Sequence, residues 1–304
     1  AQGGGESARQ DIEILVRNPN PVQTRIWEGA IEPGKEWGAE FDPSVYTDIS
    51  SAVIEVSALP PVNLSRHLEY LIQYPHGCIE QTVSAAFPQL FVDILTPLSQ
   101  KQKDQIAKNV GAAIGKMQNF QQPEGGFSYW PGGGGINDWS SSYAGHFLLE
   151  AKNKGYAVPQ SIIDRWVGYQ TEVSRRWSST SPANRNWEFY DNDLNQAYRL
   201  YTLALAGKPD LAGLNRLKEK KDMYAQAAYL LAAAYAQAGK PEAAREIASA
   251  KWRDDWRYDW CGSTYGSDLR DRALILETYT AIGDTKRAEA MVNYISKELG
   301  NQQG

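Results

Sequence analysis

The residues best suited to chemistry lie at positions 74–81, which read Tyr-Pro-His-Gly-Cys-Ile-Glu-Gln. Cys78 and Gln81 are three positions apart, after a Pro-x-Gly turn and at the start of an apolar-periodic run. If Gln81 lies on the first turn of a helix, its carboxamide can reach the sulfur of Cys78, because positions three apart share a helix face. The helix N-terminus would also stabilise a thiolate. Such a thiolate could attack the carboxamide carbon, expel ammonia and close an internal thioester, which is an activated acyl group.

A simpler interpretation gives the same two residues a structural role. Free cysteine is often a small buried core residue, so Cys78 could be core at the start of a helix. Gln81 would then be an ordinary exposed helix residue.

The stretch resembles the thioester motif Gly-Cys-x-Glu-Gln of the alpha-2-macroglobulin and complement family, which Gly77, Cys78, Glu80 and Gln81 match position for position. The flanking residues are similar to bacterial alpha-2-macroglobulins, and a weaker resemblance extends over most of the chain. The resemblance implies the thioester module of a broad-spectrum protease inhibitor. Its Cys78–Gln81 bond would capture a protease lysine once after activation, so the chain would be a covalent trap and not an enzyme.

The same resemblance implies partners and a location. The partners would be target proteases, reached through their surface lysines, and the other domains of a longer protein. The location would be the periplasm or cell envelope, with or without a lipid anchor on the parent protein.

Four further residues are expected around the bond. In bacterial relatives an aromatic residue four positions before the cysteine covers the thioester against water, and Tyr74 occupies this place; a core tyrosine is the alternative. The Gly-Gly-Phe-Ser-x-Trp pattern that ends at Trp130 recurs in family thioester domains and is expected to shape the rim; a structural loop is the alternative. His76 could relay a proton during thioester formation, and Tyr265 could line the pocket.

The histidines also bear on specificity. Some complement thioester domains carry a histidine about a hundred residues after the cysteine that steers the bond toward hydroxyl groups. No histidine follows His146 here, and His146 itself is expected in a helix core. The resemblance therefore favours direct attack by amines.

The composition excludes several classes of function. The chain has 304 residues, 42% of them hydrophobic and 22% charged, which suits a soluble globular protein with a substantial core. The net charge of −5 gives no support for nucleic-acid binding, and no apolar run is long enough to span a membrane. Three histidines and two cysteines form no recognisable metal site, and we expect no cofactor. A Cys78–Cys261 disulfide is allowed by counting but would compete for the thioester sulfur; Cys261 is expected to be a part-buried free thiol.

The first 58 residues have β character. Apolar alternation and turn signals predict short strands at 11–17, 22–28, 36–41 and 51–58. Four short strands make a thin sheet with bare edges, so we interpret this region as part of a β-sandwich. In the family the thioester domain is inserted in a CUB-type β domain, which would explain a partial sandwich.

After Leu59-Pro60-Pro61 the apolar period changes from two to about three and a half, which predicts helices. They are expected at 63–72, 79–95 with a break at Pro88, 99–119, 140–154, 160–177, 191–206, 210–220, 222–238, 241–250, 267–282 and 285–299. The fold should thus be mainly α, with an α/α toroid of about six helical hairpins over residues 59–304. A tetratricopeptide-like scaffold is the alternative architecture.

Two other functions remain open from the sequence. Acidic residues interleaved with aromatic ones also describe some carbohydrate-active toroid enzymes, which need two carboxylates at a set separation; solvated helix ends are the simpler interpretation. A helical-repeat binding scaffold without chemistry is the third possibility. The acidic residues are Glu188, Asp191, Asp193, Asp254, Asp255 and Asp259.

Overall fold

The computed structural model divides the chain into two compact units, Ala1–Val56 and Ser57–Gly304. It describes residues 71–178, 192–252 and 266–301 of the second unit. In the first unit it describes residues 2–3, 6–7, 25–27, 29, 31, 34–40, 42, 52–54 and 56.

The second unit is helical, and the predicted helices from residue 99 onward are all present with ends within three residues of the prediction. Their bounds are α4 (Gln100–Phe120), α5 (Asp138–Asn153), α6 (Gln160–Arg176), α7 (Asn192–Leu205), α8 (Leu211–Lys218), α9 (Ala225–Gln237), α10 (Pro241–Ser249), α11 (Asp268–Ala281) and α12 (Thr285–Asn301). The predicted helix at 63–72 lies outside the described residues except at its last two positions.

The predicted break at Pro88 is confirmed. Helix α2 (Ile79–Ala86) ends just before it, the 3-10 turn η3 (Pro88–Leu90) follows, and α3 (Val92–Leu95) resumes the helix. Proline has no N–H to bond the carbonyl of Ser84, so the α-helical ladder stops there. The break limits α2 to the two turns that follow Cys78.

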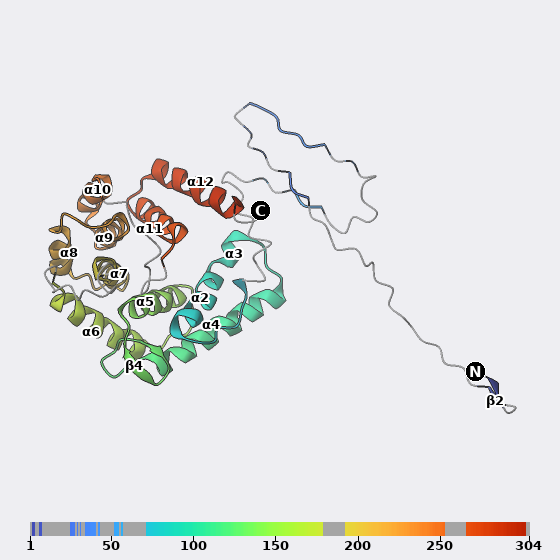
Figure 1. Cartoon of the computed structure of the whole chain (residues 1–304), viewed down its shortest axis with the longest axis horizontal. Coiled ribbons are helices and arrows are strands. Elements are labelled where there is room, and N and C mark those ends of the chain that lie inside the picture. The colour runs from blue at the N-terminus through green and yellow to red at the C-terminus, as the bar shows by residue number, and fades with distance from the viewer. Residues whose placement is uncertain are drawn as a thin grey trace. The chain divides into compact units, whose positions relative to one another are not determined.

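The helices are arranged in two concentric layers (Figure 1). Helices α2, α5, α7, α9 and α11 form the inner layer, in which each contacts the next. Helices α4, α6, α8, α10 and α12 lie outside them, and each packs on an inner helix. This is the α/α toroid expected from the sequence, and not the tetratricopeptide-like alternative.

Small and apolar side chains fill the space between the layers. Ala232, Ala233 and Ala234 of α9 are fully buried, which lets neighbouring helices approach closely. At the other end of the ring, Ile79 and Val83 of α2 are also fully buried in a second apolar cluster shared with α4 and α5. The short helix that begins at Cys78 is therefore anchored by its apolar face.

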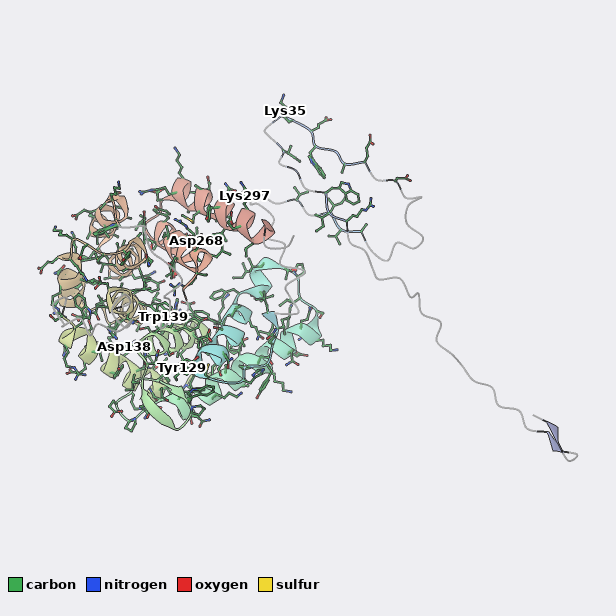
Figure 2. The ribbon with its side chains drawn as sticks, viewed as in Figure 1. Lys35, Tyr129, Asp138, Trp139, Asp268 and Lys297 are labelled. Carbon is green, nitrogen blue, oxygen red and sulfur yellow. The ribbon has the colours of Figure 1, made fainter. Side chains whose placement is uncertain are left out.

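A buried polar network ties three helices together beside this core. Arg199 of α7 is 1% exposed, and its Nη2 lies 2.8 Å from Oδ1 of Asp138 at the start of α5. Its Nε donates to Oε1 of Gln170 on α6 (3.1 Å), and its Nη1 donates to Oε1 of Gln196 (2.7 Å). Figure 2 labels Asp138 and the adjacent Trp139 where α5 begins. One guanidinium thus satisfies acceptors from α5, α6 and α7.

The strands differ from the prediction. In the first unit β1 (Gln2–Gly3) pairs antiparallel with β2 (Glu6–Ser7). The described residues of three predicted strands, at 25–27, 36–40 and 52–54 with 56, are not in strands, so the prediction is wrong there. Apolar alternation does not supply the neighbouring backbone that a ladder needs. The predicted strand at 11–17 lies outside the described residues, and the partial CUB-type sandwich stays a prediction.

The glycine-rich segment around Trp130 contains a hairpin that the sequence pattern did not indicate. Strand β3 (Ser128–Trp130) pairs antiparallel with β4 (Gly133–Ile136). Strand β3 contacts α2, α4 and α5, so this hairpin lies against the helix that follows Cys78.

Candidate functional site

Cys78 is the N-cap residue of α2, and Gln81 is the third residue of the helix. The carboxamide Oε1 of Gln81 accepts a hydrogen bond from the backbone N–H of Cys78 at 3.2 Å, while the Cys78 side chain faces the backbone N–H of Gln81. Each side chain therefore reaches the backbone of the other residue at the first turn of the helix, as the spacing of three allows. A cysteine and a carboxamide are held together without any help from distant parts of the chain.

The same capping arrangement occurs at the start of α4, where it makes a useful comparison. There Ser99 is the N-cap and its N–H donates to Oε1 of Gln102 at 2.9 Å. Such a capping box commonly does no more than satisfy the free N–H groups of a helix end. The difference at α2 is the nucleophile, because a cysteine sulfur attacks a carbonyl carbon far more readily than a neutral serine hydroxyl does.

Gly77 makes room for the Gln81 carboxamide. Its φ is +89°, a backbone conformation that L side chains rarely adopt. A Cβ at this position would lie 2.0 Å from Oε1 and 3.0 Å from the carboxamide carbon of Gln81. The glycine of the motif is therefore needed both for the turn and for the space beside the Gln81 carboxamide.

Burial distinguishes the two members of the pair. Cys78 is 1% exposed, whereas Gln81 is exposed. The sulfur is thus held away from bulk water, while the Gln81 side chain lies at the surface. Cys78 is a free cysteine, and Cys261, with which counting allowed a disulfide, lies outside the described residues.

The carboxylate of Glu80, the fourth residue of the motif, is linked to α5 through the hydroxyl groups of two other side chains. Ser84 donates its hydroxyl proton to Oε1 of Glu80 at 2.8 Å, and its Oγ lies 3.3 Å from the hydroxyl of Tyr143. Burial is the main cause that raises the pKa of Tyr143 above its usual range, and the charge of Glu80 raises it further. Tyr143 is therefore a neutral hydrogen-bonding partner at neutral pH.

The segment before Cys78 is irregular, yet side chains from other elements hold it. Nε2 of Gln89 donates to the carbonyl of Gln73 at 2.8 Å, and Oε1 of Gln89 accepts from Nδ2 of the buried Asn109 at 3.1 Å. The ammonium of Lys116, on α4, donates to the carbonyl of Pro75. The two carbonyls on either side of Tyr74 are thus both bound.

The expected shielding residues are only partly brought together. Tyr74 is 49% exposed, and Nζ of Lys116 lies 4.7 Å from the centre of its ring. His76 is exposed, and Trp130 is 57% exposed at the end of β3, where its ring packs edge-on against Tyr129, labelled in Figure 2. Tyr265 lies outside the described residues. Tyr74 lies in the motif and Trp130 on the neighbouring hairpin, so both stay candidates for shielding the predicted bond.

His146 lies in the core, as expected. Its ring meets Phe87 edge-on, and its Nδ1 is 3.0 Å from the hydroxyl of Tyr198. Burial lowers the pKa of His146 to about 4, so it is neutral at physiological pH.

Of the six acidic residues that would serve a carbohydrate-active enzyme, the structure describes Asp193. Asp193 pairs with Nζ of Lys220 at 2.6 Å, which gives it a structural partner. The other five acidic residues of that alternative lie outside the described residues. Within the described parts of the chain, no cluster of three or more His, Cys, Asp or Glu residues could hold a metal ion. No helix there has both the length and the apolar character to cross a bilayer.

Comparisons with known proteins identify the family to which the chain belongs. The family model of the A-macroglobulin TED domain matches residues 43–173, a range that includes the Cys78–Gln81 pair. Alpha-2-macroglobulin of Escherichia coli (strain K12) is 30% identical over 282 residues, which cover 87% of this chain. The chain belongs to the bacterial alpha-2-macroglobulin family. It spans 17% of the length of that relative, so it corresponds to one part of an alpha-2-macroglobulin.

Solved alpha-2-macroglobulin structures share the fold. Native Escherichia coli alpha-2-macroglobulin, from its domain MG7 to the C-terminus, matches with a TM-score of 0.64 and 25% identity over 79% of this chain and 39% of that chain. The same protein activated by porcine elastase matches with a TM-score of 0.65 and 25% identity over 81% of this chain and 23% of that chain. The toroid is therefore shared with alpha-2-macroglobulins in both states.

Two residues of this alpha-2-macroglobulin domain were not found from sequence. Lys116 is 41 positions from Pro75, and Gln89 is 16 positions from Gln73. No motif links these pairs, and only the packing of α4 and η3 beside α2 brings them together.

Proposed function

We propose that Cys78 and Gln81 form an internal thioester through which this domain captures amine nucleophiles covalently. The observation that carries the proposal is the arrangement at the start of α2, where the carboxamide of Gln81 turns back to the N–H of Cys78 at 3.2 Å. The space left by Gly77 and the burial of Cys78 support it.

Formation of the bond balances as an acyl exchange. The sulfur of Cys78 attacks the carboxamide carbon of Gln81, the carbon–nitrogen bond breaks, and ammonia leaves with the proton from the thiol. Capture runs by the same chemistry: an amine attacks the acyl carbon, an amide bond forms, and Cys78 leaves and regains a proton. Each molecule acts once, because the amide product is not turned over.

Membership of the alpha-2-macroglobulin family supports a proposal for the whole protein. We propose that the whole protein is a protease inhibitor whose thioester reacts with surface lysines of the protease that activates it. The elastase-activated state of the Escherichia coli relative supports this view. The parent would then work in the periplasm or cell envelope, where foreign proteases arrive.

Intact mass tests the proposal directly. Freshly prepared chain should be lighter than its sequence by one ammonia, and methylamine should add its own mass and free one thiol. Cys78→Ala and Gln81→Ala should show neither effect. Gln102→Ala, which breaks the matching cap of α4, should behave like the natural chain. A native mass equal to the sequence mass, in fresh chain and in the full-length parent alike, would contradict the proposal.

A further inference from the structure

The irregular segment 73–77 lies directly before the buried Cys78 and is held at two points. Gln89 binds the carbonyl of Gln73, and Lys116 binds the carbonyl of Pro75. These two carbonyls flank Tyr74, so the backbone of Tyr74 is held on both sides by donors from outside the segment.

The two holding groups are of different kinds. Gln89 also donates to the carbonyl of Ala85 at 2.7 Å and accepts from Asn109, so its amide is part of a buried structural network. Lys116 is half-buried and makes two contacts with the segment: its ammonium binds the Pro75 carbonyl and lies over the ring of Tyr74. Of these two groups, Lys116 alone touches both the backbone of the segment and the exposed ring.

We infer that Lys116 is a positioning residue that keeps Tyr74 and the segment 74–77 closed over Cys78, and so sets how fast outside reagents reach the sulfur. Its role in protecting an acyl group rests on the function proposed above. Its control of access to Cys78 does not, because Cys78 is buried as a free thiol as well.

A charged donor suits this task. A hydrogen bond from an ammonium is stronger than one between neutral groups, and a cation over an aromatic face adds further attraction. Pro75 is itself buried, and Lys116 of α4 contacts both its carbonyl and the ring of Tyr74. Loss of that side chain would leave the backbone bond from Gln89 in place but release the ring.

Alkylation of Cys78 tests the inference. The whole chain is used with Cys261→Ser, so that Cys78 is the remaining cysteine, and methylamine first opens any thioester. Iodoacetamide should then label Lys116→Met about tenfold faster than the parent, the order expected from losing the attraction between the ammonium and the Tyr74 ring. Lys116→Arg should label slowly, because a guanidinium can also bind a carbonyl and lie over a ring. Lys108→Met changes an exposed lysine of the same helix and serves as the matched control.

Coupling to Tyr74 separates positioning from a general loosening of the fold. In a Tyr74→Ala background, Lys116→Met should change the labelling rate by less than about twofold, because the ring that Lys116 holds is already gone. Lys116→Met should melt at a lower temperature than Lys108→Met with or without the Tyr74 ring, because the hydrogen bond to the buried Pro75 carbonyl is lost in both cases. Faster labelling that requires the ring is therefore not explained by this loss of stability.

The outcomes separate the two proposals. Equal labelling of Lys116→Met and its parent, or the same acceleration with and without the Tyr74 ring, would overturn the inference. A native chain that never loses ammonia would contradict the proposed function, while the labelling experiment would still decide the role of Lys116. If both proposals hold, native Lys116→Met should also lose its methylamine-sensitive mass about tenfold faster on storage in water.

Discussion

Replacement of Gly77 by alanine should prevent thioester formation with only a modest loss of stability. The new Cβ would lie 2.0 Å from Oε1 of Gln81, a distance that no pair of such atoms tolerates. The carboxamide is the end of a flexible side chain, so it can swing away into solvent. It would then leave both the N–H of Cys78 and the place from which its carbon can be attacked.

The expected cost has two parts. Forcing a non-glycine residue into the φ of +89° costs about 1–2 kcal/mol. Losing the hydrogen bond between Cys78 and Gln81 costs about 1 kcal/mol more. We therefore expect the free energy of unfolding to fall by about 2–3 kcal/mol, which leaves a folded domain whose chemistry can be assayed.

The assay is intact mass before and after methylamine, with urea denaturation to measure stability. Gly134→Ala is the matched control, since Gly134 has a φ of +90° but a Cβ added there would meet nothing within 4 Å. This variant should carry the backbone strain and keep the thioester. In a Gln81→Ala background, Gly77→Ala should cost only the strain, because the clash partner is absent.

Two results would refute this account of Gly77. Full thioester yield in Gly77→Ala would mean that the carboxamide does not need the position described. Loss of the thioester in Gly134→Ala as well would mean that strain or instability, and not the space beside Gln81, explains the effect.

Two further outcomes follow from the buried polar groups. Arg199→Met should lower the free energy of unfolding, measured in urea, by about 3 kcal/mol, because buried glutamine oxygens lose their donor while the half-exposed Asp138 can be solvated. Arg176→Met removes a residue of an exposed ion pair and should change this free energy by less than about 0.5 kcal/mol. Equal effects of the two substitutions would contradict the prediction. The pKa of His146 is lowered to about 4, below the unfolded value of about 6.5, so the unfolded chain takes up the proton first as the pH is lowered. The free energy of unfolding should therefore decrease as the pH falls from about 6.5 to about 4, by up to about 1.4 kcal/mol per pH unit. The raised pKa of Glu277 acts in the opposite sense in every variant, so the test is the difference in slope between the natural chain and His146→Phe, and identical slopes would refute it.

Much of the toroid could be predicted because its signals are local. Apolar periodicity indicated the helices and Pro88 indicated the break. Ser267, of a type common at helix starts, caps α11 by accepting from the N–H of Arg270. The pairing of Cys78 with Gln81 was predictable for the same reason, since a first helical turn brings residues three apart together.

The features that could not be predicted depend on distant partners or on backbone alone. Strand β4 consists largely of glycine, which has no side chain to show alternation, so its pattern indicated a loop and not a hairpin. The predicted strand at 36–41 has alternation but no ladder in the described residues 36–40. Arg199 carries no signal that its partners lie on α5 and α6, and the contact of Lys116 with Pro75 exists only once α4 has packed.

The two halves of this site therefore belong to different stages of chain assembly. Cys78 and Gln81 are joined by a single helical turn, so bringing them together costs little chain entropy and can happen within the time of local helix formation. The bond between Lys116 and Pro75 closes a loop of 41 residues and must wait for tertiary folding. If the proposed thioester forms, a folding chain can therefore make it before the Lys116 contact is in place. Slow docking of α4 would then lengthen the time in which water can hydrolyse the new bond.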